Sequence, residues 1–315
     1  MTAARPPDPA SVRVPGPWVH REVSANGIRL HVAEAGSGPL VLLLHGFPEF
    51  WWSWRHQLTA LAAAGLRAVA VDLRGYGDSD KPPRGYDGWT LAGDVAGLVR
   101  ALGERRACLV GHDWGGLIAW TTAALHPRLV RSIAVLAAPH PLAIRRALLR
   151  DADQRRASRH VASFALPWLP EHRLTSDGGA RVERFLRDWS GPDWVRTPGF
   201  AEVARRNRGA MAIPGAAHSA SEYYRWAARS ALRPDGVRFA RAVDRRIRVP
   251  VLALHGALDP CLLERTARAS QRWTSGEYRY HVLPGVGHFL PQEAPEQTTA
   301  LLSEFLREHP HPRCP

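Results

Sequence analysis

The sequence predicts an α/β fold in which helices cover both faces of a mostly parallel sheet. Over 18–139, and again over 247–315, short apolar runs alternate with stretches that have helical spacing. Between these regions, 140–246 contains helical patterns and loops but no convincing buried strand. Such alternation is typical of doubly wound sheets, whose strands are apolar because both of their faces are buried.

The first half of the chain contains the expected elements in regular order. The segment 18–36 predicts two strands joined at Asn26-Gly27, a dipeptide that favours tight hairpin turns. The run "LVLLLHG" at 40–46 is apolar throughout, as in a strand buried on both faces. Further strands are expected at 66–75, 107–113 and 130–139, and helices at 54–65, 90–103 and 115–127.

The second half predicts an insertion followed by a return to the sheet. Strands are expected at 247–256 and 278–284, with helices near 260–273 and 294–308. The ends of 140–246 are neighbours in the strand order, so we expect a helical cap inserted after the sixth strand and lying over the strand ends. The core would then consist of 18–139 and 247–315. We expect the Pro-rich residues 1–17 to form a disordered arm.

The positive charge of the chain invites a nucleic-acid interpretation, which the distribution of charges does not favour. The formal net charge is +13, and Lys81 is the only lysine. The arginines are interleaved with acids, as in "RVERFLRDW" at 181–189, and no nucleic-acid-binding motif accompanies them. We therefore expect a solvated arginine-rich surface and no nucleic-acid partner.

Cysteine content and hydropathy limit the cellular compartments in which we expect the protein. Cys108, Cys261 and Cys314 are scattered and show neither the spacing of metal ligands nor a disulfide framework. This pattern favours a reducing cytoplasm and predicts no metal site. No run approaches the roughly 18 apolar residues of a membrane span, so we expect no membrane partner.

The stretch "GHDWGG" at 111–116 suggests a catalytic centre. Its G-x-D-x-G frame has the spacing of a nucleophile elbow, with Asp113 in the place of a serine. Ligands of open parallel sheets bind beyond the carboxyl ends of the strands. Asp113, Asp259 and His288 each come just after an expected strand, in the chain order nucleophile, acid, histidine.

Five motifs support this interpretation: "HGFPEFWWSWRHQ" at 45–57, "DLRGYGDSDKP" at 72–82, "GHDWGG" at 111–116, "LHGALDP" at 254–260 and "GVGHF" at 285–289. Together they resemble the epoxide hydrolases of the α/β-hydrolase fold, from about residue 18 to 308. The resemblance implies conversion of an epoxide to a vicinal diol through an alkyl ester of an aspartate, without a cofactor. The haloalkane dehalogenases share the aspartate nucleophile, so the motifs separate these two families less well.

An aspartate suits this chemistry because of the bond that it forms. A serine that attacks a saturated carbon would leave an ether, whereas Asp113 would leave an ester that activated water can hydrolyse. Its ordinary pKa of about 3.9 leaves the carboxylate ionised at neutral pH. His288 would then deprotonate the water in the second step, and Asp259 would orient the imidazole and stabilise its cation.

The tetrahedral intermediate on Asp113 needs hydrogen-bond donors. The backbone N–H of Trp114, which follows the nucleophile, is the expected donor. The resemblance implies that the N–H of Phe47 is the second donor, with a cis peptide bond before Pro48. We expect an aromatic-lined pocket between cap and core that takes a small apolar or aryl epoxide; its lining would include Phe47, Trp114, Trp168 and Phe289.

Opening of an epoxide also needs an acid, and the resemblance implies two tyrosines from the cap. "SEYYRWAARS" contains Tyr223 and Tyr224, which differ by about 100° in direction on a helix, so both cannot easily reach one oxygen. The tyrosine of the family motif immediately precedes an arginine, which selects Tyr224. The position of the other tyrosine, within 158–171, holds His160. An imidazole donates either as a cation below a pKa near 6.5 or as a neutral N–H.

Two alternatives to epoxide hydrolysis stay open. A haloalkane dehalogenase would need two halide donors, for which the indoles of Trp114 and of one cap tryptophan are available: Trp168, Trp189, Trp194 or Trp226. The "YYR" segment argues against it. A ligand-binding protein without activity is compatible with the fold, but the complete set of Asp113, Asp259 and His288 argues against that alternative.

Overall fold

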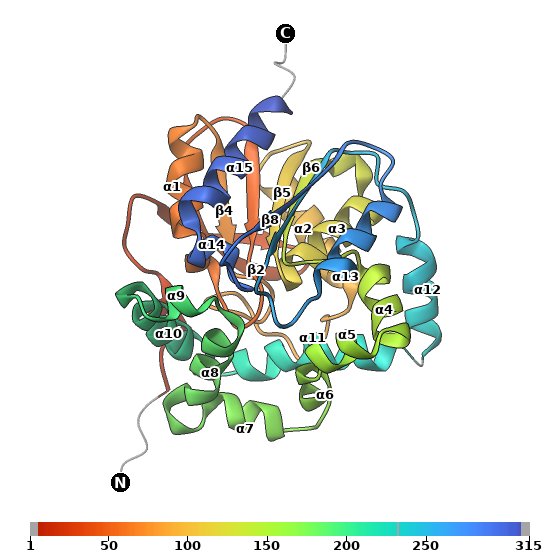
Figure 1. Ribbon diagram of the computed structural model, residues 1–315. Helices are drawn as coiled ribbons and strands as arrows, with labels where there is room; N and C mark the ends of the chain where they lie inside the picture. The colour runs from red at the N-terminus through yellow and green to blue at the C-terminus, as the bar shows by residue number, and fades with distance from the viewer. Residues whose placement is uncertain (1–5, 232, 310–315) are drawn as a thin grey trace.

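The computed structural model describes residues 6–231 and 233–309, and its centre is one eight-stranded sheet (Figure 1). The strand order is β1-β2-β4-β3-β5-β6-β7-β8. β1 pairs antiparallel with β2 and β2 antiparallel with β4, whereas the remaining pairs are parallel. The strands are β1 (Val19–Ala25), β2 (Ile28–Ala35), β3 (Leu40–Leu44), β4 (Arg67–Val71), β5 (Ala107–His112), β6 (Val130–Leu136), β7 (Val251–Gly256) and β8 (Tyr278–Leu283).

The predicted strands and the mostly parallel sheet are confirmed. All residues of β3 and β5 are buried, which agrees with their uninterrupted apolar sequences. The edge strand β1 instead exposes much of its length. The parallel pairing places the carboxyl ends of β5, β7 and β8 along the same edge of the sheet.

Helices of the core cover the two faces of the sheet. α1 and α15 pack together on one face, and α2 and α3 pack together on the other (Figure 1). The helix expected near 260–273 is instead a short α-helix, α13, followed directly by a 3-10 helix at Ala269–Trp273. The core helices are α1 (Arg55–Ala63), α2 (Gly88–Ala101), α3 (Trp114–Leu125), α13 (Glu264–Arg268), α14 (Leu290–Glu293) and α15 (Pro295–Glu308).

Between β6 and β7 the described residues form helices without a strand. These helices gather at one edge of the sheet, at the bottom and right of Figure 1. None of the helices in the described part of the chain is long and apolar enough to cross a membrane. The helices are α4 (Pro141–Arg150), α5 (Ala152–Ala157), α6 (His160–Phe164), α7 (Leu169–Thr175), α8 (Ala180–Trp189), α9 (Pro192–Val195), α10 (Pro198–Met211), α11 (Ala216–Ser230) and α12 (Pro234–Val243).

The expectation of a disordered arm over 1–17 is wrong from residue 6 onward, where the described chain begins. Pro9–Val12 forms a 3-10 helix. Val12 is 3% exposed, and its carbonyl accepts a hydrogen bond from the indole of Trp51 at 2.8 Å. One buried valine and one indole therefore anchor a segment whose composition alone predicts disorder.

Candidate active site

The Asp113 side chain is presented at a sharp turn between β5 and α3. Its backbone has φ 50° and ψ −117°, a strained conformation of the kind found at active sites. The turn leaves no room for side chains beside it: a Cβ on Gly111 would lie 2.3 Å from the Gly115 oxygen, and one on Gly115 would lie 2.1 Å from the Leu44 oxygen. The G-x-D-x-G spacing therefore has a steric cause, and it lifts the carboxylate above the strand ends.

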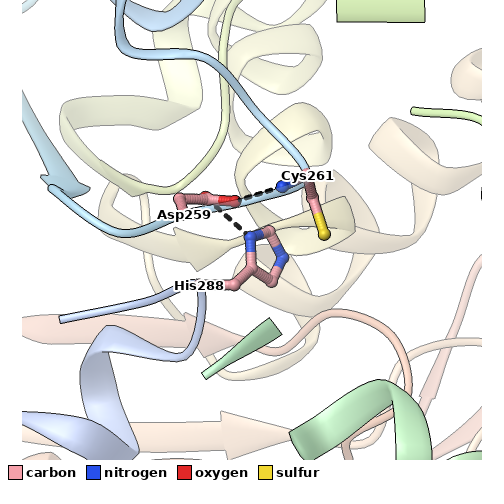
Figure 2. Close-up of side chains that lie close together, drawn as sticks. All are labelled: Asp259, Cys261 and His288. Atoms are coloured by element: carbon pink, nitrogen blue, oxygen red, sulfur yellow. Dashed lines mark hydrogen bonds and ion pairs between the residues drawn. The ribbon is translucent and has the colours of Figure 1, made fainter. Parts of the chain in front are cut away.

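The Asp259 carboxylate faces the His288 imidazole, as Figure 2 shows. His288 Nδ1 lies 2.8 Å from Asp259 Oδ2, while Asp259 Oδ1 accepts N–H bonds from Cys261 at 2.8 Å and Leu262 at 3.1 Å. His288 Nε2 lies 3.6 Å from Asp113 Oδ2. The loops after β5, β7 and β8 thus bring together the three side chains that the sequence places after strands.

Burial and the two carboxylates act on His288 in opposite directions. Burial lowers the pKa of the imidazole, but the charges and hydrogen bonds of Asp259 and Asp113 hold it well above its usual value. Burial likewise raises the pKa of Asp113 and of Asp259, yet His288 outweighs it and both pKa values lie below their usual range. Both carboxyls are therefore ionised at neutral pH, and His288 is the member of the set that carries the proton.

A half-buried carboxylate, that of Glu293, holds the loop that carries His288. Glu293 accepts hydrogen bonds from the backbone N–H groups of Gly287 and Phe289, each at 2.8 Å, and of Gly191 at 2.7 Å. Burial raises the pKa of Glu293, although these three donors oppose the shift. The sequence does not point to Glu293, because no motif singles it out and its role depends on the path of the folded loop.

Two backbone amides lie beside the Asp113 carboxylate. The Phe47 N–H donates to Asp113 Oδ1 at 2.8 Å, and the Phe47–Pro48 peptide bond is cis. Trp114 is the first residue of α3, and the first amides of a helix have no acceptor within the helix. The Phe47 N–H thus contacts the Asp113 carboxylate directly, and the Trp114 N–H, at the start of α3, has no acceptor within the helix.

Tyr224 reaches the same region from α11. Its ring lies 5.1 Å from that of Trp114 and stacks on Phe164 at 4.4 Å, measured between centroids. The two rings of Trp114 and Tyr224 meet edge to face, with an angle of 89° between their planes. Burial, reinforced by the negative charge of Asp113, raises the pKa of Tyr224 well above its usual value. The phenol therefore stays protonated and able to donate at neutral pH.

The neighbouring Tyr223 points elsewhere. Its hydroxyl donates to the Arg74 carbonyl at 2.8 Å, and its ring packs against Tyr76 and Tyr86. The two adjacent hydroxyls thus have different partners, as their angular separation on a helix requires.

His160 begins α6, and its ring lies 4.7 Å from that of Trp189 and 6.1 Å from that of Tyr224. Burial lowers the pKa of His160 to about 4, although the negative charge of Asp113 works against the shift. Of the two donor forms considered for His160, burial disfavours the cation near neutral pH, because it penalises the charged form. His160 can donate there only as a neutral N–H.

A cavity of about 320 Å³ lies between the core and the helices that follow β6. Its walls include Asp113, Trp114, His160, Tyr224 and His288. Most of the remaining lining consists of leucine, isoleucine, alanine and proline side chains from α3, α4 and α11 and the segments beside them. The charged and polar candidates therefore face a largely apolar space.

The predicted pocket lining needs correction at three residues. Trp168, expected in the pocket, is 74% exposed at the start of α7 and does not line the cavity. Phe47 and Phe289 are fully buried and also lie outside its lining. The Phe47 ring is instead covered by aromatic rings of the cap helices, such as those of Phe164 and Phe185. Trp189 lines the cavity instead, with its ring 5.7 Å from that of His288. Which tryptophan faces inward depends on how the cap helices pack, which residue type alone does not indicate.

One group of metal-type donors occurs among the described residues. The ligand atoms of Asp259, Cys261 and His288 lie within 4.8 Å of one another (Figure 2). The carboxylate of Asp259 already accepts hydrogen bonds from His288, Cys261 and Leu262. Burial also raises the pKa of the Cys261 thiol well above its usual value, which disfavours the thiolate that a metal needs. The arrangement is accounted for by the Asp259–His288 pair.

Comparison with known proteins agrees with this geometry. Residues 39–295 match a family model described as the alpha/beta hydrolase fold. The chain is 36% identical to epoxide hydrolase 3 of Xenopus tropicalis, over 90% of this chain and 76% of that protein. It is 34% identical to epoxide hydrolase A of Mycobacterium tuberculosis, over 92% and 98%. The crystal structure of epoxide hydrolase A from Mycobacterium thermoresistibile matches with a TM-score of 0.77 and 31% identity, over 92% of this chain and 98% of that one.

Proposed function

The chain belongs to the α/β-hydrolase family, with epoxide hydrolases among its relatives, and we propose that it hydrolyses an epoxide to a vicinal diol at Asp113. The observation that carries the proposal is the placement of His288 between two ionised carboxylates, 2.8 Å from Asp259 and 3.6 Å from Asp113. An anionic nucleophile, a base held by a second acid and an apolar cavity are the parts that two-step ester chemistry requires.

In the first step, Asp113 attacks an epoxide carbon and the ring C–O bond breaks. The developing alkoxide takes a proton from a donor in the cap, for which Tyr224 is placed across the cavity from Asp113 and stays protonated. His160, which also lines the cavity, is the candidate for a second, neutral donor. The product of this step is a hydroxyalkyl ester of Asp113.

Ester formation removes the negative charge of Asp113, and this change prepares His288 for the second step. The charge and hydrogen bond of Asp113 contribute to the raised pKa of His288. Once the carboxylate is a neutral ester, the pKa of His288 falls; its proton passes through solvent to the Tyr224 phenolate, and the imidazole becomes a competent base. It deprotonates a water that attacks the ester carbonyl, while the N–H groups of Phe47 and Trp114 stabilise the oxyanion and Asp259 holds the resulting imidazolium. Collapse of the intermediate breaks the ester C–O bond, and the leaving alkoxide takes the proton of His288 to give the diol. The carboxyl proton left on Asp113 then passes to His288, which restores the resting state.

The contact between the rings of Trp114 and Tyr224 favours epoxide over haloalkane hydrolysis. A dehalogenase would use the Trp114 indole to bind a leaving halide, but here the Tyr224 ring packs edge to face against the Trp114 ring, 5.1 Å away between centroids. That packing holds a protonated phenol in the lining of the cavity that contains the nucleophile, where a ring-opening acid is needed.

The same proposal extends to the domain organisation of the enzyme and to its class of substrate. We assign the sheet and its helices, 18–139 and 247–315, to a catalytic core, and 140–246 to a cap that supplies the acid donors. The apolar cavity lining supports an apolar substrate, aryl epoxides included.

The free, buried thiols of Cys108 and Cys261 support action in a reducing cytoplasm. The pairing of many surface arginines with acids supports the absence of a nucleic-acid partner.

A substrate comparison tests the proposal. The protein and its Asp113→Asn variant are assayed with styrene oxide for diol and with a terminal bromoalkane for bromide. We expect diol from the protein, no bromide, and no diol from the variant. Bromide release that depends on Asp113 would establish a dehalogenase, and the absence of both products would indicate a ligand-binding role.

A further inference from the structure

The cavity is a channel formed by matching helix faces. On α11, the lining residues Tyr224, Ala227 and Ala228, continued by Ala231 just beyond the helix, follow the i, i+3, i+4, i+7 spacing of one helix face. On α3, the residues that line the cavity between Trp114 and Thr121 follow the same spacing. Trp114 and Tyr224 contact one another at the catalytic end. Seven residues of helix advance about 10 Å, so the channel extends roughly that far from Asp113.

Small side chains keep this channel open along its length. Ala227 and Ala228 line it from α11, and their small side chains leave space that larger residues would fill. α4 forms a further wall and carries the channel to the surface: Leu149, at its far end, is 71% exposed although it lines the cavity. The channel therefore combines a closed catalytic end with an open mouth at α4.

The guanidinium of Arg145 lies at the mouth of the channel. Arg145 lines the channel from α4 and is half-buried. Its guanidinium donates a hydrogen bond to the Gly236 carbonyl at 3.3 Å, and the salt bridges within 6–231 and 233–309 include none to Arg145. The guanidinium of Arg145 is planar and carries five N–H donors, one of which makes this weak hydrogen bond. The remaining donors match the geometry of a carboxylate.

We propose that the channel selects epoxides with one slim apolar arm about 10 Å long that ends in a carboxylate, the ring lying at Asp113 and the carboxylate at Arg145. This inference rests on the proposed function. The apolar walls desolvate the arm, and the open mouth leaves the carboxylate in contact with water while Arg145 pairs with it. The net charge of +13 adds a long-range attraction for an anionic substrate.

The test compares an acid with its ester. The probes are the epoxide of undecylenic acid, its methyl ester, and propylene oxide, which has no arm. Arg145→Gln should lower the ratio of kcat/KM for the acid to that for the ester by about tenfold, as expected for a charge-assisted contact at a partly exposed site. Arg145→Lys should restore part of this ratio. Arg146→Gln, the exposed neighbour outside the channel, is the matched control and should leave the ratio unchanged.

A second variant tests the path of the arm. Ala228→Phe should lower kcat/KM for the acid and the ester far more than for propylene oxide, because the added ring fills the channel and leaves the catalytic end open. Thermal melting shows that each variant is folded. If propylene oxide is hydrolysed but Arg145→Gln leaves the acid-to-ester ratio unchanged, the role of Arg145 is wrong and the proposed function stands. If none of the three epoxides is hydrolysed, both fail.

Discussion

The two sides of the cavity differ in charge. On the core side, Asp113 and Asp259 are ionised and His288 carries a proton between them. On the cap side, burial keeps Tyr224 and His160 uncharged at neutral pH, because it raises the pKa of the phenol and lowers that of the imidazole. The difference supports the proposed division of the chemistry, in which the core forms and breaks the ester and the cap donates protons to the opening ring.

The two sides also differ in how their residues are held. The core groups accept or donate hydrogen bonds within loops that directly follow strands, as Asp259 does with the N–H groups of Cys261 and Leu262. The cap groups are placed by aromatic packing, as in the stacking of Tyr224 on Phe164. Substitutions on the core side should therefore abolish a step, and substitutions on the cap side should slow one.

The largest effect is expected from His288→Gln. Turnover of styrene oxide should fall by at least about 10,000-fold, because no base remains for ester hydrolysis. Asp113 should still be alkylated, so intact-protein mass spectrometry should detect enzyme plus substrate as a stable adduct. A folded variant that is neither alkylated nor active would place His288 in the first step and remove the division between core and cap.

Tyr224→Phe should act on the first step alone. The loss of a positioned acid should slow alkylation by about 100-fold, measured by the quenching of tryptophan fluorescence in a stopped-flow experiment. Tyr223→Phe is the control on the same helix and should change alkylation little, since its hydroxyl bonds the Arg74 carbonyl. Equal effects of the two variants would mean that packing in α11, rather than proton donation, sets the rate.

His160→Phe should have a smaller effect, about tenfold or less on alkylation, as expected for a weak neutral donor. With a pKa of about 4, His160 does not change its charge between pH 5.5 and 8. The alkylation rates of the protein and the variant should therefore run parallel across that range. A bend near pH 6–7 in the pH profile of the alkylation rate, present in the protein and absent from the variant, would mean that His160 donates as a cation.

The smallest effect concerns the N-terminal segment that packs on the core. Val12→Ala should lower the free energy of unfolding by about 1–2 kcal/mol, because it removes buried methyl groups. The exposed Ser11→Ala is the matched control and should be near neutral. Equal unfolding curves in urea for Val12→Ala and the unaltered protein would mean that this segment adds no stability to the core.

The core side of the site was predictable from the sequence because of its geometry. A strand buried on both faces is recognisable as an apolar run, and the next residues must lie at the carboxyl edge of the sheet. Asp113, Asp259 and His288 could therefore be placed together before any distance was known. The glycines around Asp113 added a steric requirement that the sequence displays directly.

The cap side was predictable only in part, because no sheet aligns its helices. The resemblance to the epoxide hydrolases selects Tyr224, but it does not indicate that Trp168 faces solvent while Trp189 faces the cavity. Sequence spacing places His160 in the cap, yet its protonation state depends on burial by residues distant in the chain. Glu293 was missed for the same reason, since its three N–H donors come together only in the folded loops.

The central claim, that Asp113 is alkylated by the substrate, is tested most directly by one turnover in water enriched in heavy oxygen. Water attacks the carbonyl carbon of the ester, so the diol takes its new oxygen from the carboxylate and Asp113 keeps the oxygen of the water. We predict an unlabelled diol and, after proteolysis, label in the peptide that contains Asp113. Label in the diol of that first turnover, with none in the peptide, would mean that water attacks the epoxide directly and would contradict the account.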